Sequence, residues 1–294
     1  MSENQLPEKG DLIRMGVGII GIGSSGPLIA MSTMPVPTLI FWRNLGGSLA
    51  TLPFALKNKV DRIGIRWSIL AGVILAAHFY SFFLAMRMTS VATGTALAAL
   101  QPIFAALFIK LTGGHIPSKA WLGMFISFAG VLLISGIDLN IDRRSFLGDL
   151  SAVICAALAA LYVMCGSRAQ KTLETTSYTT ICYGICAIVA LPLALISGFE
   201  VLHFELREWI VLLGLIAGAQ LLGHSMFNTV LKRVSPAIVS LIVFFEVPVA
   251  AVLALVFKIG KQPTLIAIPS IAIILIGCAL VVLRTRPSGV MIDE

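Results

Sequence analysis

The chain contains one pattern of five hydrophobic segments written twice. The triplet Gly10-Asp11-Leu12 opens the first segment, and Gly148-Asp149-Leu150 opens the sixth, 138 positions later. The run WSILAGVILAAH that starts at Trp67 returns as WIVLLGLIAGAQ from Trp209, at an offset of 142. Because the offset changes by only a few residues, insertions in the connecting loops explain the drift. The sequence therefore predicts two copies of one structural unit.

The composition places these segments in a lipid bilayer. Hydrophobic residues make up 58% of the chain and charged residues 12%, whereas about 25% of the residues of a soluble domain are charged. The mean hydropathy is +0.98. Ten stretches have roughly the 20 residues that a bilayer crossing needs. These predicted spans are 12–31, 36–56, 67–86, 91–111, 119–136, 146–166, 176–197, 208–227, 236–257 and 263–283.

Five crossings per copy is an odd number, so the second copy (146–294) must start on the opposite side of the membrane from the first (1–145). The sequence therefore predicts an all-α integral membrane protein of ten transmembrane helices, arranged as two inverted five-helix repeats. Inverted repeats are typical of alternating-access transporters. The first segment carries Arg14, lacks a clear cleavage site and is followed directly by another span, so we expect it to be retained rather than removed as a signal peptide.

The basic residues predict the orientation, because Lys and Arg concentrate in cytoplasmic loops. With a cytoplasmic N-terminus, 14 of them lie on the inner side, six lie on the outer side, and Arg43 lies within a span. Both termini are therefore expected in the cytoplasm. The net charge of +7 fits this asymmetry and contact with anionic lipid headgroups. The basic residues are scattered without interleaved aromatic residues, which argues against nucleic-acid binding.

Four runs of sequence resemble the drug/metabolite transporter superfamily and, within it, the EamA family. TGTALAALQPIFAALF from Thr93 and PAIVSLIVFFEVPVAAVLALVF from Pro236 are similar to its helix of small residues with a proline after the midpoint. FAGVLLI from Phe128 and IGCALVVL from Ile276 are similar to its closing helix. The chain is also similar to YddG-type aromatic amino acid exporters.

The resemblance implies ten helices around a central cavity lined mainly by the first, third and fourth helices of each repeat. It also implies export of amino acids or related metabolites across the bacterial inner membrane. Members of the superfamily that carry phosphorylated substrates have cations deep in the cavity, and the late spans of this chain have none. Zwitterionic or apolar substrates are therefore expected.

Two charges lie deep within predicted spans, where a charge is costly. Glu246, in the ninth span, either couples proton movement to transport, binds a substrate ammonium, or forms a permanent ion pair or hydrogen bond in helix packing. Gln101 occupies the equivalent position in the first copy and cannot titrate. Arg43, in the second span, either meets a substrate carboxylate or gates access, or it pairs or extends toward the outer interface. Its counterpart is Cys182.

Polar residues at helical spacing complete the predicted cavity. Gln220, His224 and Asn228 recur every four residues and therefore share one helix face. His78 aligns with Gln220 in the repeat, and Tyr80 lies close to it in sequence. For these side chains the alternative is hydrogen bonding in helix packing. The predicted substrate cavity comprises Ser24, Ser25, His78, Tyr80, Gln101, Tyr162, Gln220, His224, Asn228 and Glu246.

Three prolines interrupt predicted spans. Pro27 follows a glycine-rich stretch near mid-membrane, and it leaves backbone groups free either to face a substrate or to allow close packing of small residues. Pro102 and Pro248 occupy similar positions in the two copies and predict symmetric kinks. These kinks act as hinges or only shape the bundle.

Absent motifs limit the function classes. The sequence has no GxxxxGK[ST] motif for ATP, and no GxSxG, HExxH or paired intramembrane aspartates for catalysis. Its five cysteines fall within predicted spans without a cluster of other metal ligands, so neither a metal nor a cofactor is expected. The leading hypothesis is a secondary transporter whose partners are a small-molecule substrate, membrane lipid and, as one alternative for coupling, protons. The alternatives are a passive pore or facilitator, or an exporter of drugs or other metabolites.

Overall fold

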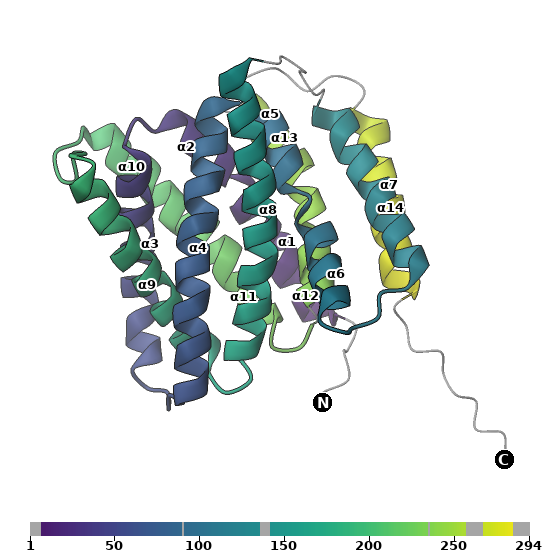
Figure 1. Ribbon diagram of the computed structural model, residues 1–294, viewed down its shortest axis with the longest axis horizontal. Helices are drawn as coiled ribbons and strands as arrows, with labels where there is room; N and C mark the ends of the chain where they lie inside the picture. The colour runs from purple at the N-terminus through teal and green to yellow at the C-terminus, as the bar shows by residue number, and fades with distance from the viewer. Residues whose placement is uncertain (1–6, 90, 136–141, 235, 257–266, 285–294) are drawn as a thin grey trace.

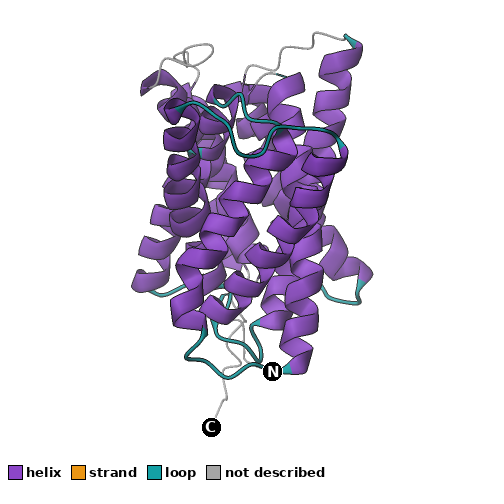
Figure 2. Cartoon of the chain, turned by 90° about the vertical axis from the view of Figure 1, so that its left-hand side faces the viewer, coloured by secondary structure: helices purple, strands orange, loops and turns teal. Residues whose placement is uncertain are grey.

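The computed structural model describes residues 7–89, 91–135, 142–234, 236–256 and 267–284, and every element in these ranges is a helix. The helices lie side by side in an elongated bundle, with loops at its two ends (Figures 1 and 2). The elements are α1 (Lys9–Gly23), α2 (Ser25–Met31), α3 (Val36–Ala55), α4 (Arg62–Met88), α5 (Val91–Ala98), α6 (Gln101–Leu111), α7 (Ser118–Ser135), α8 (Arg143–Ala169), α9 (Thr175–Ile196), α10 (Leu206–Gly214), η1 (Leu215–Ser225), α11 (Met226–Val230), α12 (Pro236–Leu241), η2 (Ile242–Phe245), α13 (Glu246–Val256) and α14 (Ala267–Arg284).

Six helical stretches in the described ranges are long and apolar enough to cross a membrane, which makes this a multi-pass membrane protein. They are Lys9–Met31, Arg62–Met88, Thr93–Leu111, Arg143–Ala169, Thr175–Ile196 and Leu206–Val230. Three shorter apolar helices and the 20-residue α3 lie beside them. The predicted spans 119–136, 236–257 and 263–283 each include residues outside the described ranges.

Aspartate caps start the two longest helices, α4 and α8, which have 27 residues each. The Asp61 carboxylate accepts hydrogen bonds from the N–H groups of Ile63 (2.9 Å) and Gly64 (3.1 Å). The Asp142 carboxylate accepts one from the N–H of Ser145 (2.9 Å). These bonds satisfy donors that a helix N-terminus leaves free, and they hold the pKa of both exposed carboxyl groups below its usual range. Both helices then continue without a break.

Other passes, meaning stretches of helix that run from one end of the bundle to the other, are interrupted just before a proline. α1 gives way to α2 at Ser24, α5 and α6 are separated by residues 99–100, and the 3-10 turn η2 precedes α13. Pro27, Pro102 and Pro248 follow these points. Proline has no N–H to bond the carbonyl four residues earlier, so irregular backbone is expected there. The helices are thus interrupted next to each of these prolines, and the action of these sites as hinges stays a prediction.

The passes pack in pairs that join the two copies. α1 packs against η1, α3 against α9, α4 against α8, α6 against α12, and α7 against α14. In Figure 1 the pair α7 and α14 lies at the right-hand side of the bundle, and α3 and α9 lie toward the left-hand side. A Cβ atom on Gly21 would lie 2.6 Å from the carbonyl oxygen of Gly218, so α1 and η1 meet backbone to backbone. Close packing therefore accounts for Gly21.

Candidate functional site

A cavity lies between the N-terminal and C-terminal halves of the chain, at the level of the helix interruptions. Its volume is about 60 Å³, counted as the space open to the centre of a water molecule. That is room for water, because one water needs about 10–15 Å³ on such a scale. The wall comes from the first, third and fourth passes of each copy, as the family resemblance implies. It consists of Ile22, Ser25, His78, Phe79, Phe82, Ala98, Gln101, Cys155, Ala159, Tyr162, Val163, His224, Phe227, Asn228, Leu231, Val239, Val243 and Glu246.

The structure brings most of the predicted cavity residues together in this wall. They come from six different passes, and each reaches the cavity from a position next to a helix interruption or from one of the long helices α4 and α8. These residues are Ser25, His78, Gln101, Tyr162, His224, Asn228 and Glu246. Their action on a substrate stays a prediction.

Three other predicted cavity residues lie outside the wall. Ser24 turns back on its own helix, and its hydroxyl donates a hydrogen bond to the Gly21 carbonyl oxygen (2.6 Å). Tyr80 is 42% exposed on the outside of α4. It lies two positions after His78, and residues two positions apart in an α-helix point to nearly opposite sides. Gln220 is fully buried and faces α3. The α-helical spacing that predicted one polar stripe fails there, because η1 is a π-helix with more than four residues per turn.

Hydrogen bonds hold several of the polar side chains of the wall. The Asn228 amide donates to the Tyr162 hydroxyl oxygen (2.7 Å), which joins α11 to α8. His78 Nδ1 lies 3.0 Å from the Cys155 carbonyl oxygen, which can only accept, so Nδ1 carries the proton. The His224 ring meets the Phe79 ring edge to face, with centroids 5.2 Å apart. The wall therefore combines fixed polar groups with aromatic faces.

Glu246 and Gln101 begin the second halves of the two equivalent interrupted passes, at the first residues of α13 and α6. Gln101 Nε2 donates to the Ser240 hydroxyl oxygen (3.2 Å). Glu246 is only 7% exposed, yet its carboxylate forms no hydrogen bond or ion pair with any other described residue. The alternative of a permanent ion pair in helix packing is therefore absent from the described part of the chain.

Arg43 is completely buried in α3. Its Nε donates to the Gln220 side-chain oxygen (2.7 Å), and its guanidinium carbon lies 4.2 Å from the centroid of the Phe79 ring. The prediction that Arg43 extends toward the outer interface is therefore wrong, because a hydrogen bond and a cation–π contact stabilise the guanidinium inside the bundle.

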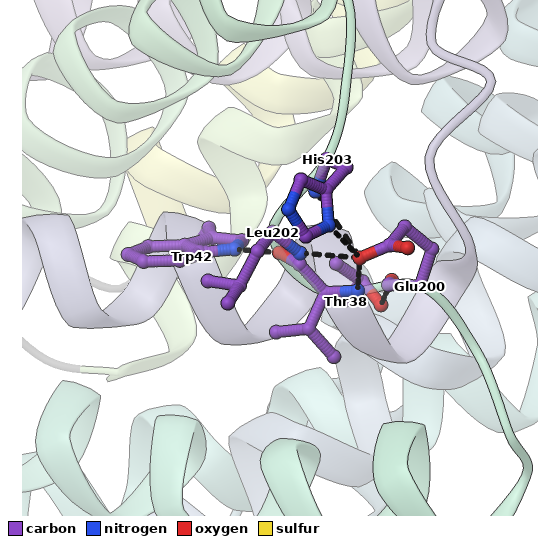
Figure 3. Close-up of polar contacts among 6 residues, drawn as sticks. Thr38, Trp42, Glu200, Leu202 and His203 are labelled. Carbon is purple, nitrogen blue, oxygen red and sulfur yellow. Dashed lines mark hydrogen bonds and ion pairs between the residues drawn. The ribbon is translucent and has the colours of Figure 1, made fainter.

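A loop after α9 packs on the N-terminal end of α3 (Figure 3). Thr38 and Trp42 donate hydrogen bonds to the carbonyl oxygens of Glu200 (2.8 Å) and Val201 (2.7 Å). The exposed Glu200 carboxylate accepts the N–H groups of Val201 (2.9 Å), Leu202 (2.8 Å) and His203 (3.1 Å). These backbone hydrogen bonds lower the pKa of Glu200 to about 2.

Polar contacts between the two halves of the chain lie at both ends of α1–α2 and α10–α11. Glu208, at the start of α10, accepts hydrogen bonds from the Ser32 hydroxyl (2.7 Å) and the Thr33 N–H (3.0 Å) after α2. Asp11, at the start of α1, pairs with Arg233 after α11 (2.6 Å). Because α1–α2 and α10–α11 run antiparallel, these contacts lie at opposite ends of the bundle.

The sequence reasoning missed both closing carboxylates. Asp11 lies in the repeated Gly-Asp-Leu triplet, which the sequence analysis treats only as the start of a segment. In the structure Asp11 is buried, at 1% exposure, and pairs with Arg233. Glu208 begins its segment in the same way. A carboxylate at the first turn of an apolar segment was the available signal, but the residue that it meets lies more than 170 positions away in the chain.

Among the residues that the structure describes, no group of His, Cys, Asp and Glu could hold a metal ion. The buried wall is instead suited to bind a small solute through hydrogen bonds, charge and aromatic contact. A multi-pass helical bundle around such a cavity is typical of membrane transport proteins.

The comparisons with known proteins identify the family. The model of the EamA-like transporter family matches residues 11–136 and 146–283, so the chain belongs to this family. Among relatives, an uncharacterized transporter from Bacillus subtilis is 27% identical over 94% of this chain and 90% of its own length. A pseudopaline exporter from Pseudomonas aeruginosa is 27% identical over 72% of this chain and 74% of its own length. These names point to transporters and not to enzymes.

Two further matches agree. An uncharacterized transporter from Archaeoglobus fulgidus is 31% identical over 44% of this chain, and the match spans 45% of that relative's length. A solved crystal structure has a TM-score of 0.76 at 17% sequence identity, and the match covers 94% of this chain and 98% of the other. That likeness supports the fold alone. The similarity to YddG-type exporters stays a prediction.

Proposed function

We propose that this protein is a secondary transporter of the bacterial cytoplasmic membrane that exports amino acids, aromatic ones among them, or related small metabolites by alternating access. The observation that carries the proposal is the cavity between the two halves of the chain. Its wall contains the Glu246 carboxylate, which pairs with no described residue. It also contains side chains that form hydrogen bonds, and aromatic rings. Such a wall fits an amphiphilic solute with one charged end and one apolar end. A relative named as an exporter supports the direction.

The proposed architecture is ten membrane crossings in two inverted repeats. The packing pairs support it, because they are unchanged when the copies are exchanged. The pair of passes one and eight (α1 with η1) becomes the pair of passes six and three (α8 with α4), and the other pairs map onto themselves. α1 begins and α14 ends on the same side of the bundle (Figure 1), which fits an even number of crossings with both termini in the cytoplasm.

Alternating access requires that the cavity open to one side at a time. The contact of Glu208 with Ser32 and Thr33 closes one end between the copies, and the pair of Asp11 with Arg233 closes the other. Rocking of one copy against the other separates one contact while the other stays intact. This account explains why buried carboxylates lie at both ends of the same pair of passes.

The test is uptake into proteoliposomes that contain the purified protein. Labelled phenylalanine and leucine are supplied outside, with unlabelled amino acids as competitors and empty liposomes as the control. We expect saturable uptake that a competing substrate reduces. If no amino acid enters faster than into empty liposomes, the substrate assignment is wrong.

A further inference from the structure

Arg43 carries a buried charge that no carboxylate in contact balances. Its Nε donates to Gln220 (2.7 Å) and one Nη donates to the Ser25 hydroxyl (3.4 Å). Both acceptors are neutral, and Arg43 forms no ion pair with any residue of the described ranges. The second Nη is buried without a hydrogen-bond partner. A buried unpaired charge is costly, so such an arginine inside the membrane points to a functional partner.

The guanidinium of Arg43 lies directly behind the cavity wall. Ser25 and Phe79 both line the cavity, and both contact Arg43, one through the long hydrogen bond and one through its ring face. At 3.4 Å the bond to Ser25 exceeds the usual range of about 2.7–3.2 Å. A stronger acceptor that enters beside Ser25 can therefore replace its hydroxyl as the partner of the guanidinium.

The opposite charge belongs to the cavity wall itself. Glu246 lines the cavity without a hydrogen-bond or ion-pair partner among the described residues, and Arg43 contacts Ser25 and Phe79 of the same wall. Glu246 thus lies in the cavity wall and Arg43 directly behind it, and neither has an ion-pair partner among the described residues. A solute with both a carboxylate and an ammonium group satisfies both charges.

We infer that Arg43 binds the carboxylate of the transported substrate, and that Glu246 receives its ammonium group. This inference rests on the proposed function and narrows the substrate class to zwitterions with a free carboxylate. The rings of Phe79, Phe82 and Phe227 in the same wall then receive the apolar side chain. A guanidinium suits this task, because its planar fork matches the two oxygens of a carboxylate.

A purely structural role for Arg43 makes a different prediction. In that case Arg43 only ties α3 to η1 through Gln220, and its loss affects every substrate equally. The two roles are separated by comparing L-phenylalanine with L-phenylalaninamide, in which a neutral amide replaces the carboxylate. Both compounds have the same ring, and the assay is run at about pH 6, where the amino groups of both are protonated.

The first variant is Arg43→Gln, assayed in proteoliposomes. We expect wild-type protein to prefer phenylalanine over the amide by about tenfold or more in kcat/KM, the effect of one charge-assisted hydrogen bond. In Arg43→Gln the KM for phenylalanine rises by about the same factor while that for the amide changes little. Equal changes for the two compounds, or a preserved preference, would overturn the inference.

The second variant, Gln220→Glu, keeps Arg43 and tests the same idea if Arg43→Gln does not fold. The new carboxylate stands where Gln220 already accepts from Arg43 (2.7 Å), so it competes with the substrate carboxylate. We expect the preference for phenylalanine to fall toward one. Gln170→Glu is the matched control, since Gln170 is a buried glutamine at the end of α8, and it should leave the preference unchanged.

The outcomes separate the inference from the function beneath it. If wild-type protein carries neither compound, the proposed amino acid function fails, and the inference fails with it. If wild-type protein carries phenylalanine and Gln220→Glu leaves its preference over the amide intact, only the role of Arg43 is wrong.

Discussion

At the scale of single residues, a pair of equivalent positions differs in its ability to titrate. Glu246 and Gln101 follow equivalent helix interruptions, but only Glu246 has a proton to exchange. Gln101 is held by Ser240, whereas Glu246 has no partner among the described residues. The carboxylate is therefore the side chain of this pair that can respond to substrate or protons.

Replacing Glu246 by glutamine tests proton coupling. Glutamine keeps the size of the side chain and removes its titrating proton, so we expect Glu246→Gln to lose the acceleration of transport by an imposed pH gradient. Initial rates of uptake with and without the gradient measure this. Glu205→Gln makes the same chemical change at an exposed position and should behave as wild type. An unchanged response in Glu246→Gln would remove this carboxylate from coupling.

The loop of Glu200 has a predictable pH dependence. Its carboxylate is bound by three backbone N–H groups, and its pKa is lowered to about 2. A group whose folded pKa is depressed stabilises the fold above its unfolded pKa, about 4.3 for glutamate, and this contribution disappears as the pH falls through the folded pKa. Hydrogen-exchange protection at Leu202 and His203 should therefore be constant from neutral pH to about pH 5 and decrease toward pH 2.

The matched variant is Glu200→Gln, which cannot accept these hydrogen bonds as an anion. We expect faster exchange at Leu202 and His203 at neutral pH, measured by mass spectrometry of the loop peptides. Protection equal to wild type would show that the contacts of Thr38 and Trp42 with the loop carbonyls order the loop without the carboxylate.

Several residues of the site could be predicted because the period of an α-helix applies to them. His224 and Asn228 lie four apart and both reach the cavity. Gln220 lies four before His224, but the intervening π-helix turns it toward Arg43. The sequence LIAGAQLLGHS has no proline to signal that change. Long-range partners such as Arg233 for Asp11 were also beyond reach, because no local pattern encodes them.

At the scale of helices, glycine spacing decides how closely α1 approaches η1. A Cβ atom on Gly21 would lie 2.6 Å and 2.7 Å from backbone atoms of Gly218 and Gly223, whereas one on Gly16 has nothing within 4 Å. We expect Gly21→Ala to reduce the free energy of unfolding by about 1–3 kcal/mol through overpacking. Gly16→Ala should leave it unchanged or raise it by up to about 1 kcal/mol. Thermal unfolding in detergent measures both, and equal melting temperatures would contradict the close approach.

Prolines of two kinds allow a test of the hinges. Pro102 and Pro248 follow interruptions, whereas Pro53 and Pro192 lie inside the continuous helices α3 and α9. Alanine restores a backbone N–H at each position. We therefore expect Pro102→Ala and Pro248→Ala to slow transport several-fold without loss of thermal stability, because the bend between the two halves stiffens. Pro53→Ala and Pro192→Ala are the controls. Similar transport rates in all four variants would show that the kinks only shape the bundle.

Hydropathy and proline positions were sufficient to locate most helices and their breaks. The predicted starts at residues 67 and 146 are late by several residues, because α4 and α8 begin at the polar caps Asp61 and Asp142, which a hydropathy pattern does not include. Hydrogen bonding by a carboxylate at a helix start extends these helices beyond their apolar part.

At the scale of the whole molecule, the pairing of passes across the two copies explains where the cavity lies. One pair, α4 with α8, is continuous, and the opposite pair, α1–α2 with η1–α11, is interrupted. The cavity lies between the rigid pair and the interrupted pair, with Gln101 and Glu246 beside it. Internal repetition in the sequence predicts two copies, but only the packing relates one copy to the other.

The proposed mechanism requires that this cavity open to each side of the membrane in turn. Exchange of unlabelled for labelled phenylalanine across the membrane of proteoliposomes tests this requirement. Liposomes that contain the protein are loaded with unlabelled phenylalanine, and the initial uptake of labelled phenylalanine is compared with that into unloaded liposomes. In an alternating-access carrier the binding site returns from the inside to the outside faster when it holds substrate than when it is empty. We therefore predict that loading the liposomes with phenylalanine accelerates uptake. Uptake that is neither saturable nor accelerated by loading would contradict the account and would indicate a passive pore.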